Sequence, residues 1–163
     1  MKLHLPAIIT SLFLAVATLT PALALEPPRI VPRMQEIQKP IDAVYEAMKK
    51  YFTDSSLSHF QLVSADPKTR TLVAKQVGVD NESWTKWAFC ETGPVQMIYK
   101  LEDGTVVVTV KLRKSTRHAT FASVSADFEG TYGLGANQNK VGCTSKFALE
   151  DNLLAVAGAA HGK

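Results

Sequence analysis

The sequence is poor in cysteine and has no strong excess of charge of either sign. Cys90 and Cys143 are the only cysteines among its 163 residues, and they lie too far apart for a C-x-x-C redox motif or a zinc-ligand pair. The formal net charge at pH 7 is +3, from 18 lysines and arginines against 15 acidic residues. Proteins dedicated to nucleic acids usually carry a marked basic field. We therefore predict neither a cysteine-based metal site nor a nucleic-acid partner.

Motifs that identify common enzymes are also missing. The sequence contains no G-x-S-x-G and no H-E-x-x-H, and the stretch GLG at 133–135 lacks the helix that should follow it in a dinucleotide-binding fingerprint. His59, His118 and His161 form no closely spaced ligand pair. A hydrolytic triad stays open, because such triads are assembled in space; it would need a cleft in which His59 or His118 meets a carboxylate. We expect a protein without catalytic activity, metal or cofactor.

The first residues have the pattern of a secretory signal peptide. An uncharged apolar run covers residues 7–19, Pro21 follows, and Ala22-Leu23-Ala24 forms an A-x-A cleavage site. The run is shorter than the roughly 20 residues of a membrane-spanning helix, which argues against a membrane anchor. No cysteine lies near the cleavage site for lipid attachment. We predict removal of residues 1–24, a periplasmic or secreted protein, and no transmembrane segment in the mature chain.

Export gives the two cysteines a chemical context, because disulfides persist in oxidising compartments. A Cys90–Cys143 disulfide accounts for both residues more simply than two free thiols do. In the chain-entropy description, a bridge that closes a loop of this length stabilises a fold by about 4 kcal/mol. A catalytic thiol would need a basic neighbour to lower its pKa, and no histidine is adjacent to either cysteine in the sequence. The sequence therefore predicts a structural disulfide.

The mature chain begins with a proline-rich segment and then a helix. Residues 25–39 contain Pro27, Pro28 and Pro32, which favours an extended leader; the alternative is a strand along a sheet edge, where proline is tolerated. Pro40 suits the first turn of a helix, which we predict over residues 40–52. The apolar side chains that recur there with helical spacing and predict a buried face are Ile41, Val44, Tyr45, Met48 and Phe52.

The pattern then changes to the alternation and turn residues of β-strands. Strands are predicted over residues 60–64, 71–79, 83–90, 95–101, 105–113 and 118–128. Asp103-Gly104 predicts a hairpin turn, and the glycine-rich residues 129–140 predict a long polar loop. Ser145 is expected to cap a second helix over residues 146–157, with Glu150 and Asp151 facing water. Residues 159–163 are expected to be a frayed tail.

These elements predict a single α+β domain over residues 40–158. An antiparallel sheet of five to six strands has one face to bury, and the N-terminal and C-terminal helices are available to cover it in two layers. The disulfide is expected to clamp the last helix onto this sheet.

The order helix, antiparallel strands, helix resembles the helix-grip class. It is similar to small exported bacterial domains like those of the BamC lipoprotein, from the machinery that assembles outer-membrane barrels. The stretch CTSKFALEDNLL at 143–154 also resembles the end of many small exported bacterial proteins. The resemblance implies a fold and no functional residues, and the lipid-attachment cysteine of such lipoproteins is absent here.

Two groups of side chains are candidates for contacts with a partner. The turn over residues 111–118 is the densest basic cluster; it either meets an anionic partner or forms a solvated hairpin tip whose charges discourage edge pairing. Trp84 points away from Trp87 and Phe89 in the predicted strand, so it is either exposed for contacts or covered by a helix. The candidate interaction surface comprises Trp84, Tyr132, Lys111, Arg113, Lys114 and Arg117.

We expect a small exported, disulfide-stabilised binding or interaction module of the bacterial envelope, with an envelope protein as its partner. The alternative is a carrier of a small apolar ligand, held in a cavity between the sheet and the C-terminal helix. A carrier should keep an apolar hole lined by residues such as Met48, Val108 and Leu154. An interaction module should be filled there and should expose its apolar area instead. The partner's identity and the oligomeric state stay open.

Overall fold

The computed structural model describes residues 30–90, 100–134 and 137–159 of the chain. The predicted signal peptide, most of the strand predicted over residues 95–101 and most of the predicted tail lie outside the described residues, so these stay predictions. Among the described residues, no helix is both long enough and apolar enough to cross a membrane.

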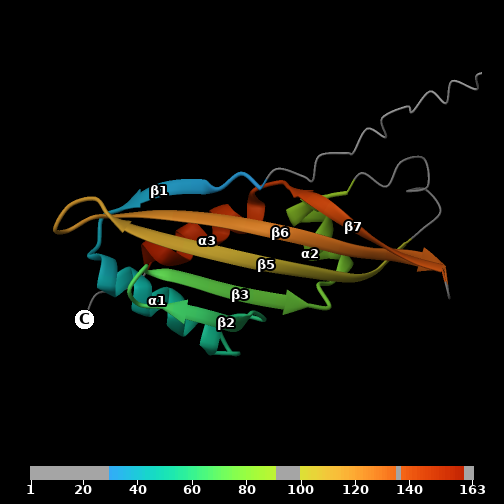
Figure 1. Ribbon diagram of the computed structural model, residues 1–163, viewed down its shortest axis with the longest axis horizontal. Helices are drawn as coiled ribbons and strands as arrows, with labels where there is room; N and C mark the ends of the chain where they lie inside the picture. Colours follow the sequence, from blue (N-terminus) through green and yellow to red (C-terminus); the bar gives the residue numbers. More distant parts are fainter. Residues whose placement is uncertain (1–29, 91–99, 135–136, 160–163) are drawn as a thin grey trace, which may run out of the picture.

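The described residues form one antiparallel sheet of seven strands together with three helices (Figure 1). The strand order is β2-β3-β5-β6-β7-β4, and β1 pairs with β6 on the same side as β7 but further along the strand. The predicted α+β class is confirmed. The strands are β1 (Arg33–Ile37), β2 (Gln61–Asp66), β3 (Thr71–Val77), β4 (Ala88–Phe89), β5 (Lys100–Lys114), β6 (Thr120–Leu134) and β7 (Asn137–Ser145), and the helices are α1 (Ile41–Thr53), α2 (Asn81–Trp87) and α3 (Ala148–Ala159).

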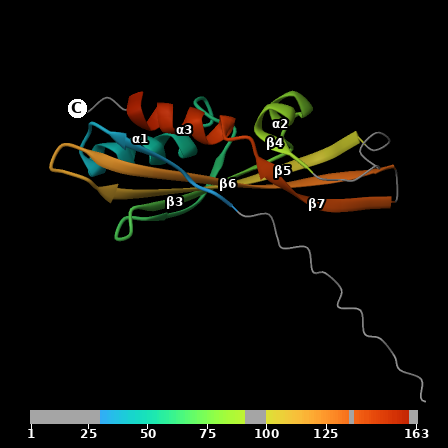
Figure 2. The same ribbon diagram turned by 90° about the horizontal axis from the view of Figure 1, so that it is seen from above.

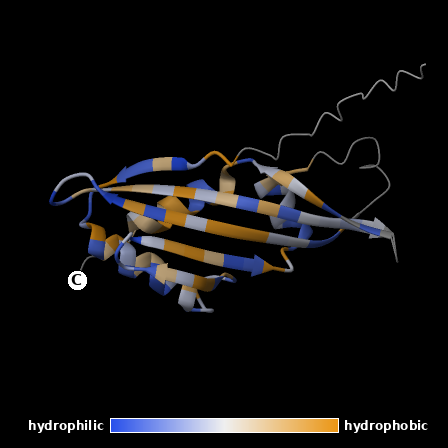
Figure 3. Ribbon diagram, in the orientation of Figure 1, coloured by the Kyte–Doolittle hydropathy of each residue, from blue (hydrophilic) through white to orange (hydrophobic). Residues whose placement is uncertain are grey.

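The core lies on one face of the sheet, and all three helices lie on that side (Figure 2). Side chains alternate between this inner face and the opposite outer face, and Figure 3 shows the resulting alternation of hydropathy along the long strands β5 and β6. The inner residues of β5 and β6 that the structure buries are Val106, Val108, Val110, Leu112, Ala122, Val124, Ala126 and Phe128. The two faces predicted for these strands are therefore confirmed.

Helix α1 forms where the apolar stripe predicted it, starting directly after Pro40. It buries Val44, Tyr45, Met48 and Phe52 against the sheet. Asp42 lies in its first turn and Lys50 in its last, which is the arrangement that the helix dipole favours.

Part of the proline-rich leader lies along the sheet, as the edge-strand alternative predicted. Strand β1 pairs with residues 120–124 of β6. The Arg33 side chain at its start donates to the Asp151 carboxylate of α3 at 2.9 Å, and its guanidinium lies 5.2 Å from the centre of the Phe147 ring. The leader therefore connects the sheet edge to the C-terminal helix.

The predicted strand over residues 83–90 is wrong, because most of it is helix α2. The Asp80 carboxylate caps this helix by accepting from the Ser83 backbone N–H at 2.8 Å. Lys86 and Glu82 form an i,i+4 ion pair of 2.7 Å on its exposed side. Only the two residues of β4 keep the predicted strand conformation.

The predicted polar loop over residues 129–140 is also wrong. Strand β6 continues to Leu134, and β7 begins at Asn137 and pairs with it. The predicted hairpin turn at Asp103-Gly104 lies inside β5, next to an irregularity in register between Leu101 and Asp103. The β5–β6 pair is therefore longer than the sequence suggested.

The C-terminal helix begins two residues later than predicted, at Ala148. Ser145 still stabilises its start: the Ser145 hydroxyl accepts from the Phe147 backbone N–H and donates to a Glu150 carboxylate oxygen, both at 2.8 Å. Glu150 was expected to face water but is completely buried. Asp151 is exposed, as expected.

Candidate functional site

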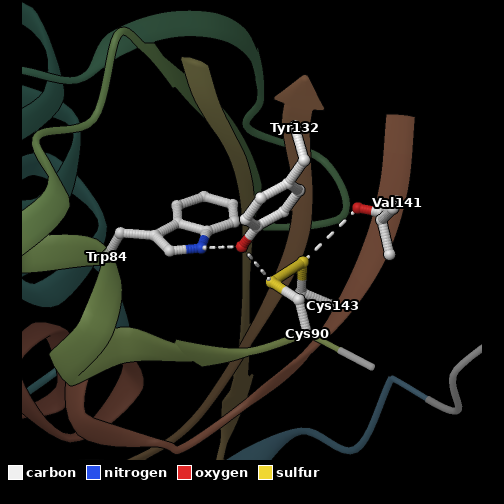
Figure 4. The surroundings of a disulfide bond; sticks show 5 residues. All are labelled: Trp84, Cys90, Tyr132, Val141 and Cys143. Atoms are coloured by element: carbon white, nitrogen blue, oxygen red, sulfur yellow. Dashed lines mark hydrogen bonds between the residues drawn. A yellow bond between two sulfur atoms is a disulfide. The ribbon is translucent and has the colours of Figure 1, made fainter. Parts of the chain in front are cut away.

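The predicted disulfide between Cys90 and Cys143 is confirmed, and both cysteines are buried (Figure 4). Cys90 follows β4, and Cys143 lies in β7, next to the paired residues Phe89 and Thr144. The bridge therefore joins β7 to the segment that follows α2. It does not act on α3 directly, as the sequence had suggested, because α3 begins only after β7 has ended.

Tyr132 connects the disulfide to Trp84 (Figure 4). Its hydroxyl accepts from the indole N–H of Trp84 at 3.3 Å and donates to the Cys90 sulfur at 3.1 Å. The Trp84 ring also packs edge-on against Phe128, with ring centres 5.6 Å apart. Trp84 is 3 % exposed and therefore anchors α2 in the core.

Two glycines that face each other across β5 and β6 make room for this tryptophan. Gly104 and Gly130 are direct partners in the β5–β6 register. A Cβ atom on Gly104 would lie 2.6 Å from the Trp84 ring, and one on Gly130 would lie 2.7 Å from the Tyr132 ring. Both distances are shorter than real contacts allow, so the indole occupies the space that side chains would take in an ordinary sheet.

The candidate interaction surface predicted from the sequence does not form a single surface. Trp84 is buried, so the expectation that it is exposed for contacts is wrong, and the alternative of a covered tryptophan holds. Tyr132 is half-buried and pairs with Leu101 near one end of the β5–β6 ladder. The exposed basic residues lie at its opposite end, around the β5–β6 turn: Lys111, Arg113, Lys114 and Arg117.

The outer face of the sheet carries a feature that the sequence analysis did not single out. Along the middle of β3, β5 and β6 it presents short apolar and hydroxyl side chains, and within the described residues no helix lies over it (Figure 2). Phe121, Val77 and Met34 there are 43 %, 60 % and 64 % exposed. The residues that define this outer face are Met34, Glu36, Gln61, Thr71, Val73, Lys75, Val77, Thr105, Val107, Thr109, Lys111, Arg113, Phe121, Ser123, Ser125, Asp127 and Glu129.

Charge is distributed unevenly along this outer face. Lys111 and Arg113 lie at the end near the β5–β6 turn, beside Ser123 and Phe121. Glu36 lies beside Phe121 at that same end. Asp127 and Glu129 lie on β6 beyond Thr109, where exposed Lys75 shares the row of Asp127 and Lys140 forms a 2.8 Å ion pair with Glu129. Lys111 and Arg113 are therefore the two basic side chains that one end of the face presents, whereas acidic and basic groups are mixed at the other end.

The apolar cavity expected of a ligand carrier is filled. Met48 and Val108 are completely buried, and Leu154 is 3 % exposed. A cavity of about 280 Å³ does lie between β3 and α3, where the end of α1 meets α2, but none of these three residues lines it.

The side chains required for a catalytic or metal site do not come together in the described part of the chain. His59 and Asp80 line the same cavity, but no ion pair or hydrogen bond joins them. His118 is exposed at the β5–β6 turn. Within residues 30–90, 100–134 and 137–159, no group of three or more His, Cys, Asp or Glu side chains is arranged to hold a metal ion.

Comparison with known proteins gives no family for this chain. No family model matches the sequence, and no curated protein matches it. Among solved structures, a DUF4468 family protein from Bacteroides ovatus ATCC 8483 is similar at 14 % sequence identity with a TM-score of 0.35. The match covers 70 % of this chain and 64 % of that protein's chain.

Proposed function

We propose that this chain is a small exported binding module of the bacterial envelope, stabilised by its disulfide, which binds a protein partner through the outer face of the sheet and catalyses no reaction. The observation that carries this proposal is where the apolar surface lies. The space between sheet and helices is filled around Met48 and Val108, whereas Phe121, Val77 and Met34 are exposed on the outer face. Phe121 and Met34 lie close together on the neighbouring strands β6 and β1, and adjacent exposed apolar residues are typical of an interaction site; Val77 is exposed at the far end of the same face.

The shape and charge of the outer face indicate which kind of partner surface would fit it. Threonine, valine and serine side chains in the centre form a shallow surface, which suits the face-to-face packing of two sheets. Lys111 and Arg113, at the end near the β5–β6 turn, orient that contact. We therefore expect an envelope protein whose own β-surface carries acidic groups opposite Lys111 and Arg113.

Export and the two-layer, helix-grip-like arrangement belong to the same proposal. The apolar run over residues 7–19 and the A-x-A site support export, and the buried disulfide suits an oxidising compartment. The mass of the protein isolated from the periplasm tests export, because the exported chain should lack residues 1–24. A chain that keeps residues 1–24 and remains in the cytoplasm would contradict it.

A photo-crosslinking residue placed at Thr109 tests the binding surface in the native envelope. We expect it to join the chain to one defined envelope protein, whereas the same residue at the exposed Glu46 of α1 should not. The double substitution Lys111→Glu/Arg113→Glu should abolish the crosslink. Lys114→Glu is the matched control, because Lys114 belongs to the same strand end but its partner Thr120 points to the inner face.

The outcome of the crosslinking experiment decides the proposal. Equal crosslinking from Thr109 and Glu46, or full retention of the crosslink after charge reversal, would show that the outer face is not the binding surface. Crosslinks that join only two copies of this chain would replace the envelope partner by self-association.

A further inference from the structure

The cavity of about 280 Å³ lies between elements that are distant in the sequence. The end of α1 and the following residues 55–60 form one side, β3 the floor, and α2 and α3 the other sides. The lining includes the aromatic residues Tyr51 and Trp87 and the polar residues Gln76, Asp80, Ser83 and Asn152. The cavity is distinct from the apolar hole expected of a carrier, and it lies on the opposite side of the sheet from the proposed protein-binding face.

Gln76, on the floor of this cavity, is a polar residue in an otherwise apolar row of side chains. The inner face of β3 presents Leu72, Ala74 and Gln76, and all three are buried. Gln76 is 9 % exposed, and no hydrogen bond joins its amide group to any residue that the structure describes. Its polar atoms are not among the fully buried ones without a partner, so water reaches them through the cavity. A ligand that displaces this water takes over its hydrogen bonds to the amide.

The remaining lining combines aromatic surface with hydrogen-bonding groups. Trp87 and Tyr51 are half-buried at the cavity, and partial burial raises the pKa of the Tyr51 hydroxyl, so it stays a neutral donor and acceptor. Hydrogen bonds from the hydroxyl and the backbone N–H of Ser83 lower the pKa of Asp80, which therefore stays ionised. The exposed amide of Asn152 lies on the α3 side.

These properties limit the chemistry of the ligand. His59 is the single basic residue among the described lining residues, with no lysine or arginine beside it, and Asp80 is negative, which disfavours phosphate, sulfate and carboxylate ligands. The volume lies at the lower end of the about 300–1,000 Å³ typical of small-molecule sites, so it accommodates one ring rather than a chain. Aromatic walls suit a flat apolar face, and the amide and carboxylate groups suit hydroxyls at its edge.

We propose that this cavity binds a single uncharged sugar ring, with Gln76 making the central hydrogen bonds and Trp87 contacting the ring face. The proposal is independent of the protein-binding function of the outer face. Lys111→Glu/Arg113→Glu should therefore leave sugar binding unchanged.

Titration of the isotopically labelled, oxidised mature chain with glucose, galactose, mannose and N-acetylglucosamine tests this by NMR. We expect at least one sugar, at millimolar concentration, to shift the backbone signals of Gln76 and Ser83 and the indole signal of Trp87. Choline and inorganic phosphate serve as cationic and anionic probes. Binding of choline or phosphate in place of every sugar, or no shift with any sugar, would overturn the proposal.

The substitution Gln76→Leu separates a binding role from a structural role. Leucine keeps the side-chain volume and removes an amide that has no hydrogen-bond partner among the described residues, so thermal stability should change little, while the affinity for the sugar should fall by about tenfold or more. Gln61→Leu is the matched control: Gln61 is exposed on the outer face, and neither quantity should change greatly. Asn152→Ala, on the exposed side of α3, provides a second binding variant that the fold should tolerate. If Gln76→Leu binds the sugar as tightly as the wild-type chain, the assignment is wrong.

Discussion

The fit of Trp84 against the paired glycines makes a sharp prediction for the substitution Gly104→Ala. The added Cβ would lie 2.6 Å from one carbon of the Trp84 ring and 2.9 Å from another, whereas ordinary contacts begin at about 3.4 Å. The ring must therefore move by nearly an ångström. It is 3 % exposed and packed against Phe128, so the movement disturbs the core and weakens the hydrogen bond from Trp84 to Tyr132.

The expected size follows from two opposing effects. Overpacking of a core costs about 1–3 kcal/mol. Replacement of a glycine inside a strand by alanine returns about 0.5–1 kcal/mol through the lower entropy of the unfolded chain. We expect Gly104→Ala to lower the free energy of unfolding by about 1–2 kcal/mol, measured by urea denaturation with an unchanged dependence on urea.

Gly158→Ala is the matched control, because no atom lies within 4 Å of the position its Cβ would take in α3. The same chemical change should there raise the free energy of unfolding by about 0.5–1 kcal/mol. In the double variant Gly104→Ala/Trp84→Phe, the smaller ring should relieve the contact, so the two losses should not add. If Gly104→Ala is as stable as Gly158→Ala, the explanation of the paired glycines is refuted.

Three further predictions concern other parts of the fold. The paired substitution Cys90→Ala/Cys143→Ala should lower the free energy of unfolding by up to about 4 kcal/mol, and a urea midpoint equal to that of the wild-type chain would contradict the stabilising role of the bridge. Asp80 has a lowered pKa in the folded state. Its contribution to the stability of the fold is therefore present above the unfolded-state pKa of about 3.9 and is lost as the pH falls through the folded-state pKa. Asp80→Asn keeps the cap but cannot titrate, and its melting temperature should therefore fall less than that of the wild-type chain between about pH 5 and pH 2. Glu150 is completely buried, and one of its carboxylate oxygens has no hydrogen-bond partner. Glu150→Gln keeps an acceptor for the Ser145 hydroxyl and leaves the other side-chain position without a partner, as in the wild-type chain, so the free energy of unfolding should change by less than about 1 kcal/mol, checked by urea denaturation; a larger loss would contradict this role of Glu150.

The sequence predicted those elements whose stability depends on one regular pattern. The apolar stripe of α1 and the alternation of β5 and β6 report directly which side chains are buried, and the structure buries them. The disulfide followed from the predicted export and the lack of any other use for two cysteines. In each case a local pattern and the tertiary structure favour the same conformation.

The errors occur where a tertiary contact reverses the local signal. Tryptophan and phenylalanine favour strands on average, but that preference depends strongly on context. In α2 the polar residues decide instead, through the Asp80 cap and the Lys86–Glu82 pair. Gly130 was assigned to a loop because glycine often indicates flexibility, whereas it lies in the sheet beneath an indole from a helix. No pattern within the strand itself reveals that requirement.

The candidate sites were harder to predict than the fold, for the same reason. The outer face becomes visible only when the register aligns Thr109, Ser125 and Val73 from three strands. The cavity combines residues from α1, β3, α2 and α3. One signal was present in the sequence: Gln76 interrupts the apolar positions Leu72 and Ala74 of an alternating strand, and a polar residue in such a position indicates a functional role.

The disulfide and the cavity are linked through α2. This helix has seven residues, too few to be stable alone, so its position depends on tertiary contacts. Trp84 anchors it to the sheet, the Trp87 carbonyl accepts from the Lys146 backbone N–H at 2.8 Å, and the Cys90–Cys143 bridge ties down the segment that follows. Asp80, Ser83 and Trp87 line the cavity, so its α2 wall is held in place partly by the bridge.

Reduction of the bridge should therefore loosen the α2 wall of the cavity before it affects the outer face. In hydrogen exchange of the reduced chain, we expect the amides of α2 to lose more protection than those of β5 and β6, because the β5–β6 ladder is paired along its length by strands that contain neither cysteine. The affinity for the sugar should fall on reduction, and the crosslink from Thr109 should persist. The Cys90→Ser/Cys143→Ser variant should reproduce this pattern without a reductant. A uniform loss of protection across α2, β5 and β6 would instead mean that the bridge stabilises the domain as a whole and has no particular influence on the cavity.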